Sequence, residues 1–259
     1  MAGVSGNPLM FSKTVLLDAR AHQNWRITRA ADFSFSRNLR FLPVTLTEFA
    51  QVALEQPLVF IEDGDLIVPV SVIALDEDNN LFLDESGGWD GRYLPAYVRM
   101  YPFILAPRSD ASGYAVCVDA DYPGLAAGKG EALFDEDGEQ TTVTKNAIAF
   151  AAEYQRQREE SVVFTALLKR YGLLEPASVN VTTGGEEVIY VGGFLTVNRE
   201  KLAKLDSESV LNLHALGQLE PIYLQLASLS NFDALSRRRS GGHGHARGPS
   251  RARGLRVRA

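Results

Sequence analysis

Hydrophobic residues follow a strand-like pattern through the first half of the chain. Short apolar runs, rich in β-branched and aromatic residues, alternate with clusters of Asp, Asn and Gly that are typical of turns. One of these clusters, at 62–65, carries the Asp-Gly signature of a β-hairpin. The pattern therefore predicts a largely antiparallel sheet. Its expected strands are 58–61, 66–75, 81–83, 103–105 and 114–118.

A long helix is predicted after these strands, over residues 142–171. Thr142 or Thr144 can cap its start, and Gly172 follows its last apolar position. Its first and last thirds carry apolar residues, whereas its middle, from Gln155 to Glu160, is wholly polar. We expect the two ends to be buried and the middle to face solvent or a partner.

Shorter elements complete the pattern. A hairpin is expected at 179–191 around Gly184-Gly185, and an earlier short helix at 48–55 after Thr45 or Thr47. Helices are expected at 199–205, 207–216 and 222–229, the first two capped by Asn198 and by Asp206 or Ser207.

These elements predict an α+β fold with a mainly antiparallel sheet, one long helix and a helical C-terminal end. We expect one domain over residues 11–236, a flexible N-terminus at 1–10 and a disordered Arg- and Gly-rich tail at 237–259. With 259 residues, 46% of them hydrophobic, the chain can form a sizeable core.

The net charge of −6 conceals an asymmetry. The tail at 237–259 holds eight arginines and no acidic residue, so residues 1–236 keep 18 basic and 32 acidic residues, a net charge of −14. An acidic fold argues against a specific nucleic-acid partner, which a basic face would bind. The tail either contacts phosphate groups weakly or is an extension without a function of its own, and the second interpretation is favoured.

The single cysteine, Cys117, excludes an intrachain disulfide and a cysteine-based zinc site, and it fits a reducing compartment. The first ten residues lack the pattern of a signal peptide, and no apolar segment approaches the ~20 residues that span a bilayer. We therefore expect a cytoplasmic protein without a transmembrane segment.

Residues with catalytic or metal-binding chemistry are scarce. His22 and His214 are the histidines of the expected domain, and neither stands beside a nucleophile motif. His243 and His245 lie in the tail. The acidic clusters at 62–65, 76–80 and 135–138 lack the ligand spacing of a calcium loop, and turns explain them better. We expect no metal, no cofactor and no catalytic constellation.

An aromatic stretch at 89–103 stands out from this background. Trp89, Tyr93, Tyr97 and Tyr101 recur at a spacing of four, which forms one stripe on a helix, and prolines limit such a helix to one or two turns. A core anchor is the favoured interpretation, because aromatic stripes usually pack. The alternative is a groove for a ligand or partner, formed by these four side chains with Arg99.

The same stretch, with its pattern Tyr-x-Pro-x-Tyr-x-Arg-x-Tyr-Pro-Phe, resembles the bacterial SapC family. The resemblance continues through 133–139, the long helix with Phe150 and Tyr154, 193–202 and 222–232, and it covers roughly residues 10–236. It implies an accessory protein for envelope, surface-layer or peptide-uptake functions. It supplies no catalytic residues that can be assigned to this chain.

Two hypotheses follow. The favoured one is a binding or adaptor protein without catalysis, which contacts a protein or peptide through the aromatic stretch. The alternative is an enzyme that modifies a peptide or small molecule with carboxylates and tyrosine hydroxyls as acid and base. Its candidate carboxylates are Asp84, Glu85 and Asp90, beside the stretch.

Overall fold

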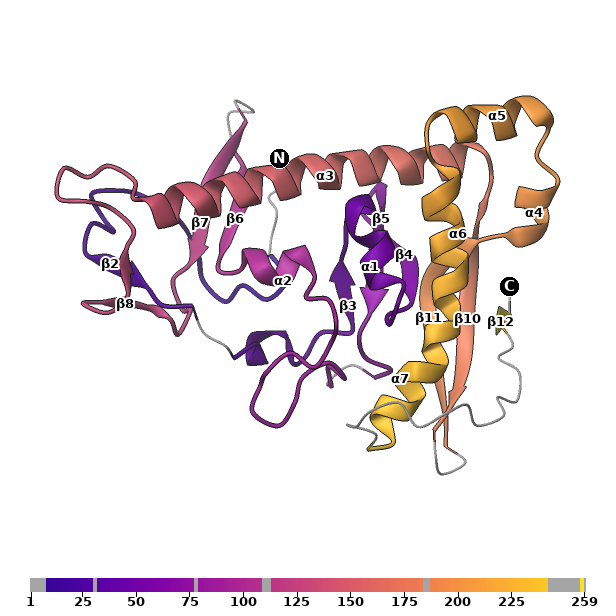
Figure 1. Ribbon diagram of the computed structural model, residues 1–259, viewed down its shortest axis with the longest axis horizontal. Helices are drawn as coiled ribbons and strands as arrows, with labels where there is room; N and C mark the ends of the chain where they lie inside the picture. The colour runs from indigo at the N-terminus through magenta and orange to yellow at the C-terminus, as the bar shows by residue number, and fades with distance from the viewer. Residues whose placement is uncertain are drawn as a thin grey trace. The chain divides into compact units, whose positions relative to one another are not determined.

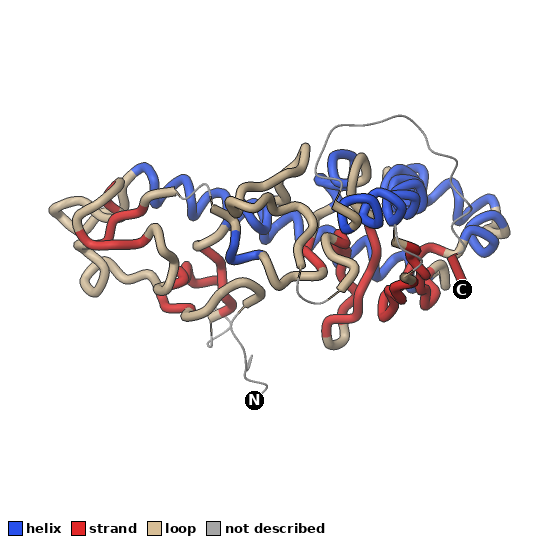
Figure 2. Tube along the Cα trace, turned by 90° about the horizontal axis from the view of Figure 1, so that it is seen from below, coloured by secondary structure: helices blue, strands red, loops and turns tan. Residues whose placement is uncertain are grey.

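The computed structural model describes residues 8–29, 32–76, 79–108, 113–183, 187–241 and 257–258. Its antiparallel sheets and helices confirm the predicted α+β class (Figures 1 and 2). Within the span expected to form one domain, the chain divides into two compact units. Unit 1 comprises Met1–Ser36 and Ala96–Arg156, and unit 2 comprises Arg37–Pro95 and Gln157–Ala259.

Unit 1 contains two small antiparallel sheets, in the strand orders β1-β7-β6 and β8-β2-β9. The strands are β1 (Thr14–Leu16), β2 (Trp25–Ile27), β6 (Phe103–Pro107), β7 (Tyr114–Asp119), β8 (Leu125–Ala127) and β9 (Glu131–Ala132). The 3-10 helix η1 (Ser34–Ser36), α2 (Ala96–Met100) and the start of α3 (Thr142–Arg170) complete the unit. Strands β6 and β7 confirm the two predicted at 103–105 and 114–118.

A buried carboxylate organises the polar part of unit 1. Asp119 has no exposed surface, and its two oxygens accept hydrogen bonds from the backbone amides of Ser12 and Lys13, at 2.8 and 2.9 Å, and of Asp121, at 3.2 Å. The Tyr101 hydroxyl donates the fourth bond at 2.9 Å. One side chain thus ties the segment before β1 to the end of β7.

Unit 2 is built on a six-stranded sheet in the order β12-β10-β11-β4-β5-β3. The strands are β3 (Phe41–Pro43), β4 (Leu58–Asp63), β5 (Leu66–Val72), β10 (Leu174–Thr182), β11 (Val188–Val197) and β12 (Val257–Arg258). The β4–β5 hairpin turns at Gly64, whose φ of 61° favours glycine, as the Asp-Gly pair predicts.

The helices of unit 2 follow the predicted order. They are η2 (Leu46–Glu48), α1 (Phe49–Val52), the end of α3 (Thr142–Arg170), α4 (Arg199–Ala203), α5 (Ser207–Ala215), α6 (Leu219–Ser228), η3 (Leu229–Asn231) and α7 (Phe232–Arg239). Asn198 and Asp206 cap α4 and α5 with their side chains, as expected. Helix α6 covers one face of the sheet at β11 and β4 (Figure 1).

Helix α3 has the predicted extent, and Gly172 at φ 65° ends it. Its polar middle lies at the surface, as expected, because none of residues 155–160 is buried. Two of its side chains also bond within the chain. Gln155 donates to the Tyr114 hydroxyl at 2.8 Å, and Gln157 accepts from Thr47 at 2.7 Å. The boundary between the units falls between these two glutamines, after Arg156.

Two expectations need correction. The predicted strand at 81–83 is a turn with one isolated bridge, Leu83 to Trp89, because the Asp84 carboxylate accepts from the amides of Ser86 and Gly88 and bends the backbone. The predicted tail begins later than residue 237, because α7 continues through Arg239. Arginine favours helices, and here Arg239 pairs with Asp76.

Some expected features lie outside the described residues. They are the N-terminal residues 1–7, the Gly184-Gly185 turn, and tail residues 242–256 and 259 with their two histidines.

Two fully buried glutamines in unit 2 provide a matched stability test. Gln225 bonds to strands β4 and β11, whereas neither amide atom of Gln56 has a hydrogen-bond partner among the described residues. We expect Gln56→Met to raise the free energy of unfolding by about 1 kcal/mol, since it removes an unsatisfied amide, and Gln225→Met to lower it by roughly 2–3 kcal/mol. Urea unfolding measures both. Destabilisation by Gln56→Met would show that this amide has a partner.

Asp119 predicts a pH dependence for unit 1. Burial disfavours its charged form, but the bonds from Ser12, Lys13, Asp121 and Tyr101 together outweigh burial and lower the carboxyl pKa from 3.8. The stabilisation is therefore fully present above the unfolded pKa and is lost as the pH falls through the lower, folded value. We expect Asp119→Asn to cost about 2–3 kcal/mol at pH 7 and to remove this acid-dependent part.

The control for Asp119 is Asp121→Asn, whose side chain is exposed and should change stability by less than about 0.5 kcal/mol. Urea unfolding from pH 7 down to pH ~2.5 separates the two variants. Equal pH profiles for Asp119→Asn and the unmodified chain would contradict the assignment.

Candidate functional site

The aromatic stretch does not form the helical stripe that its spacing predicts. Only Tyr97 and Arg99 lie in α2, which begins after Pro95, and the stretch crosses from unit 2 to unit 1 at that residue. Trp89 and Tyr93 precede the helix in irregular backbone, where the Trp89 ring nitrogen donates to the Tyr93 carbonyl at 3.0 Å. Proline restricts the residue before it to extended conformations, which explains why the helix starts so late.

In unit 2, Trp89 belongs to a stack that ends in an arginine. Its ring lies parallel to that of Phe82, with centroids 5.6 Å apart. The guanidinium of Arg238 lies 4.3 Å from the Phe82 centroid and pairs with Asp90 at 3.0 Å. Arg238 also lies 4.0 Å from Glu55. The stack therefore joins α7 to the turn that carries Trp89.

Tyr93 joins a buried polar group in the same unit. Its hydroxyl donates to Glu48 at 3.1 Å, and its amide donates to Glu55 at 3.1 Å. Glu48 is buried and also accepts from the amide and hydroxyl of Thr45, which completes the capping box of η2. These bonds give Tyr93 a packing role beside the core.

Tyr97 and Tyr101 are packed inside unit 1. Tyr97 is only 6% exposed and donates to the Leu9 carbonyl at 2.9 Å. Tyr101 lies among aromatic rings, and burial together with its bond to Asp119 raises the pKa of its hydroxyl. A raised pKa makes this tyrosine a poor base near neutral pH.

Arg99 is the exposed member of the predicted groove, and its guanidinium lies 5.2 Å from the Phe150 centroid. The favoured interpretation, a core anchor, fits the four aromatic residues. Contact of any of the five with a ligand stays a prediction.

The three candidate carboxylates of the enzyme hypothesis each have a different environment among the described residues. Asp84 holds the turn at Ser86 to Gly88, Asp90 pairs with Arg238, and Glu85 is exposed. His22 lies against Trp25 and accepts from the Asp18 amide, and His214 is exposed on α5. Within the described ranges, no group of three or more His, Cys, Asp and Glu residues is arranged to hold a metal.

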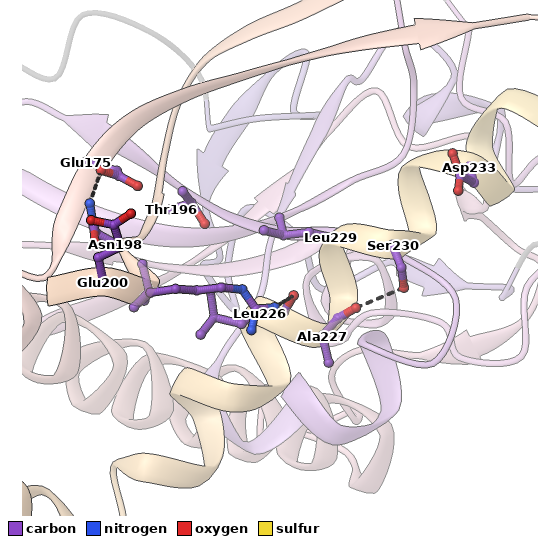
Figure 3. A pocket seen from close by; sticks show the side chains of 11 residues that line it. Glu175, Thr196, Asn198, Glu200, Leu226, Ala227, Leu229, Ser230 and Asp233 are labelled. Atoms are coloured by element: carbon purple, nitrogen blue, oxygen red, sulfur yellow. Dashed lines mark hydrogen bonds between the residues drawn. The ribbon is translucent and has the colours of Figure 1, made fainter. Parts of the chain in front are cut away.

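A pocket that the sequence did not indicate lies wholly in unit 2. It has a volume of about 460 Å³ and opens between the β11–α4 connection and the segment from α6 to α7 (Figure 3). The lining residues are Glu175, Thr196, Val197, Asn198, Arg199, Glu200, Leu226, Ala227, Leu229, Ser230 and Asp233.

Charge and apolar surface alternate along this pocket. Glu175 and Glu200 lie at one end, with Asn198, and Asp233 lies at the opposite end (Figure 3). Leu226, Ala227 and Leu229 contribute the apolar surface. Three carboxylates against the one arginine of the lining give a net charge of −2.

Hydrogen bonds fix the polar side chains of the pocket. Asn198 donates to the Glu175 carboxylate, and its own oxygen caps α4 at the Lys201 amide, 2.7 Å away. Arg199 donates to the Leu226 carbonyl at 3.1 Å, which joins α4 to α6. The sequence signalled only the Asn198 cap, because the other lining residues come from segments far apart in the chain.

Comparison with known proteins assigns the family. The family model described as SapC matches residues 17–235, which is more than half of the chain. The chain belongs to the SapC family.

The match covers both compact units of this SapC chain and ends before the arginine tail. No curated protein and no solved structure matches it. No helix among the described residues is long and apolar enough to cross a membrane. The chemistry of this SapC chain therefore has to be inferred from its own side chains.

The Arg238 stack makes a testable prediction. We expect Arg238→Ala to lower the free energy of unfolding by about 2 kcal/mol, since a partly buried ion pair and a cation–π contact are lost. The fluorescence emission of Trp89 should shift to longer wavelength, because its ring becomes more exposed to water. Trp25→Phe is introduced into both the Arg238→Ala variant and its reference protein, so that Trp89 is the tryptophan observed. Arg237→Ala is the control, because Arg237 is the neighbouring arginine on α7 and its side chain is exposed. An unchanged Trp89 spectrum in Arg238→Ala would contradict the role of the stack.

Proposed function

We propose that this SapC chain is an accessory binding protein that takes an extended basic peptide segment into the unit 2 pocket. The segment has basic side chains on either side of a small or apolar residue. The wider role, in envelope, surface-layer or peptide-uptake functions of a bacterium, and a cytoplasmic location are parts of the same proposal. The wider role rests on the family resemblance, and the location rests on the sequence pattern of residues 1–10 and the single cysteine.

The observation that carries the proposal is the order of chemistry along the pocket. Carboxylates at both ends attract cations, and the apolar surface between them suits an aliphatic or small side chain. A single metal ion or a small cation would leave that apolar surface unused. A peptide with alternating basic and apolar positions uses both.

Preorganisation supports binding at this place. Glu175 is held by Asn198, and Arg199 is held by the Leu226 carbonyl. Side chains that are fixed before the ligand arrives lose less conformational entropy on binding. The exposed Ala227 and Ser230 lie on the open side of α6 and η3, where a peptide backbone can approach.

The direct test is binding of a labelled peptide in which leucine stands between two lysines. We expect fluorescence anisotropy to show binding that weakens with salt, and Ala227→Arg to reduce the affinity by about tenfold or more, ~1.4 kcal/mol. The new arginine fills the pocket and repels the basic peptide. Because Ala227 is exposed on a helix, the substitution should leave the fold intact.

Ala215→Arg is the matched control, since it adds the same charge at an exposed position at the end of α5, outside the pocket. It should retain affinity within about twofold. Equal loss in both variants would show that net charge, rather than the pocket, determines binding. The same peptide with glutamates in place of lysines should not bind.

A further inference from the structure

The arginine tail offers an occupant for this pocket within the same chain. Residues 242–259 contain five arginines, two histidines and no acidic residue. The arginines alternate with small or apolar residues from Arg251 to Arg258, in the order Arg-Ala-Arg-Gly-Leu-Arg-Val-Arg. This is the pattern that the pocket's acidic ends and apolar middle would accept.

We propose that the arginine tail, residues 242–259, docks in the unit 2 pocket and competes there with the peptide ligand. The inference rests on the proposed function, since it names the regulation of the same site. The occupant is the chain's own segment, and the contact is electrostatic, between its guanidinium groups and Glu175, Glu200 and Asp233.

The tail can reach the pocket. It follows α7, whose first turn contributes Asp233 to the lining, and the helix rises about 9 Å from Asp233 to Arg239. An extended segment covers ~3.3 Å per residue, so the tail spans up to about 55 Å. The chain end also pairs with β10, where Arg258 lies opposite Ser178. Strand β10 is the strand that carries Glu175.

The energetics favour docking despite a weak contact. A short flexible tether gives its end a local concentration on the order of 1 mM. If the free tail sequence binds with a dissociation constant of roughly 0.1–0.5 mM, the tethered tail occupies the pocket most of the time. A competing peptide would then bind about 3–10-fold more weakly than to an open pocket.

The competition is tested on the full chain with the five tail arginines replaced by glutamine. We expect the labelled lysine–leucine–lysine peptide to bind this variant about 3–10-fold more tightly than the unmodified chain. Replacement of the same five arginines by lysine is the control, because it keeps the positive charge of the tail and should change the affinity far less than the glutamine variant does. Equal affinities for the glutamine variant and the unmodified chain would overturn the proposal.

A second measurement does not depend on the added peptide. A spin label at Ser250→Cys is read by NMR, since Cys117 is buried and burial raises its thiol pKa, which slows its labelling. We expect broadening of the Ala227, Ser230 and Glu200 amide signals, and its loss in about 1 M salt, where the screening length is ~3 Å. No broadening at these amides would overturn the docking.

The two measurements separate the two proposals. Broadening in the unmodified tail sequence, without peptide binding to the glutamine variant, would keep the tail contact and reject the peptide-binding function. Peptide binding that the tail variant does not alter, without broadening, would keep the function and reject the tail contact.

Discussion

The buried contact of the Gln225 side chain with two strands holds β4, β11 and α6 of unit 2 together. Its amide nitrogen donates to the Leu58 carbonyl of β4 at 3.0 Å, and its oxygen accepts from the Val197 amide of β11 at 3.2 Å. Strands β4 and β11 are themselves registered at a single pair, Leu195 and Phe60. The Gln225 side chain therefore links the two strands to each other and fixes α6 against them. A buried amide with all these bonds satisfied specifies one arrangement, because any shift leaves polar atoms unpaired.

The pocket depends on this arrangement. One wall comes from the residues that follow Thr196 on β11, and the other comes from the helix turn that follows Gln225. Arg199 adds a second tie between them at the Leu226 carbonyl. Binding a peptide here would need little rearrangement, because both walls are fixed through the core. The acidic groups remain at the ends of the pocket, where water still reaches them and desolvation costs little.

The aromatic stretch and the C-terminal helix serve the fold in a different way. Trp89, Phe82 and Arg238 stack in unit 2, while Tyr101 and Asp119 hold unit 1. The stretch is thus divided between two cores, and its aromatic residues stabilise each separately. Two of the arginines that follow Leu235, Arg238 and Arg239, form ion pairs with acidic residues of the fold.

The local sequence pattern was sufficient to predict many of the secondary-structure elements of this protein. The β4–β5 hairpin, the extent of α3 and the caps at Asn198 and Asp206 follow from neighbouring residues alone, since turns, caps and periodicity act over a few positions. The helical stripe at Trp89 to Tyr101 failed, because hydrogen bonds to Glu55 and packing on Phe82 outweighed spacing. The pocket could not be predicted, since Glu175, Glu200 and Asp233 meet only when β10 pairs with β11 and α6 docks on the sheet. The sequence determined the elements and the charge of the tail; tertiary packing alone decided which distant side chains share one pocket.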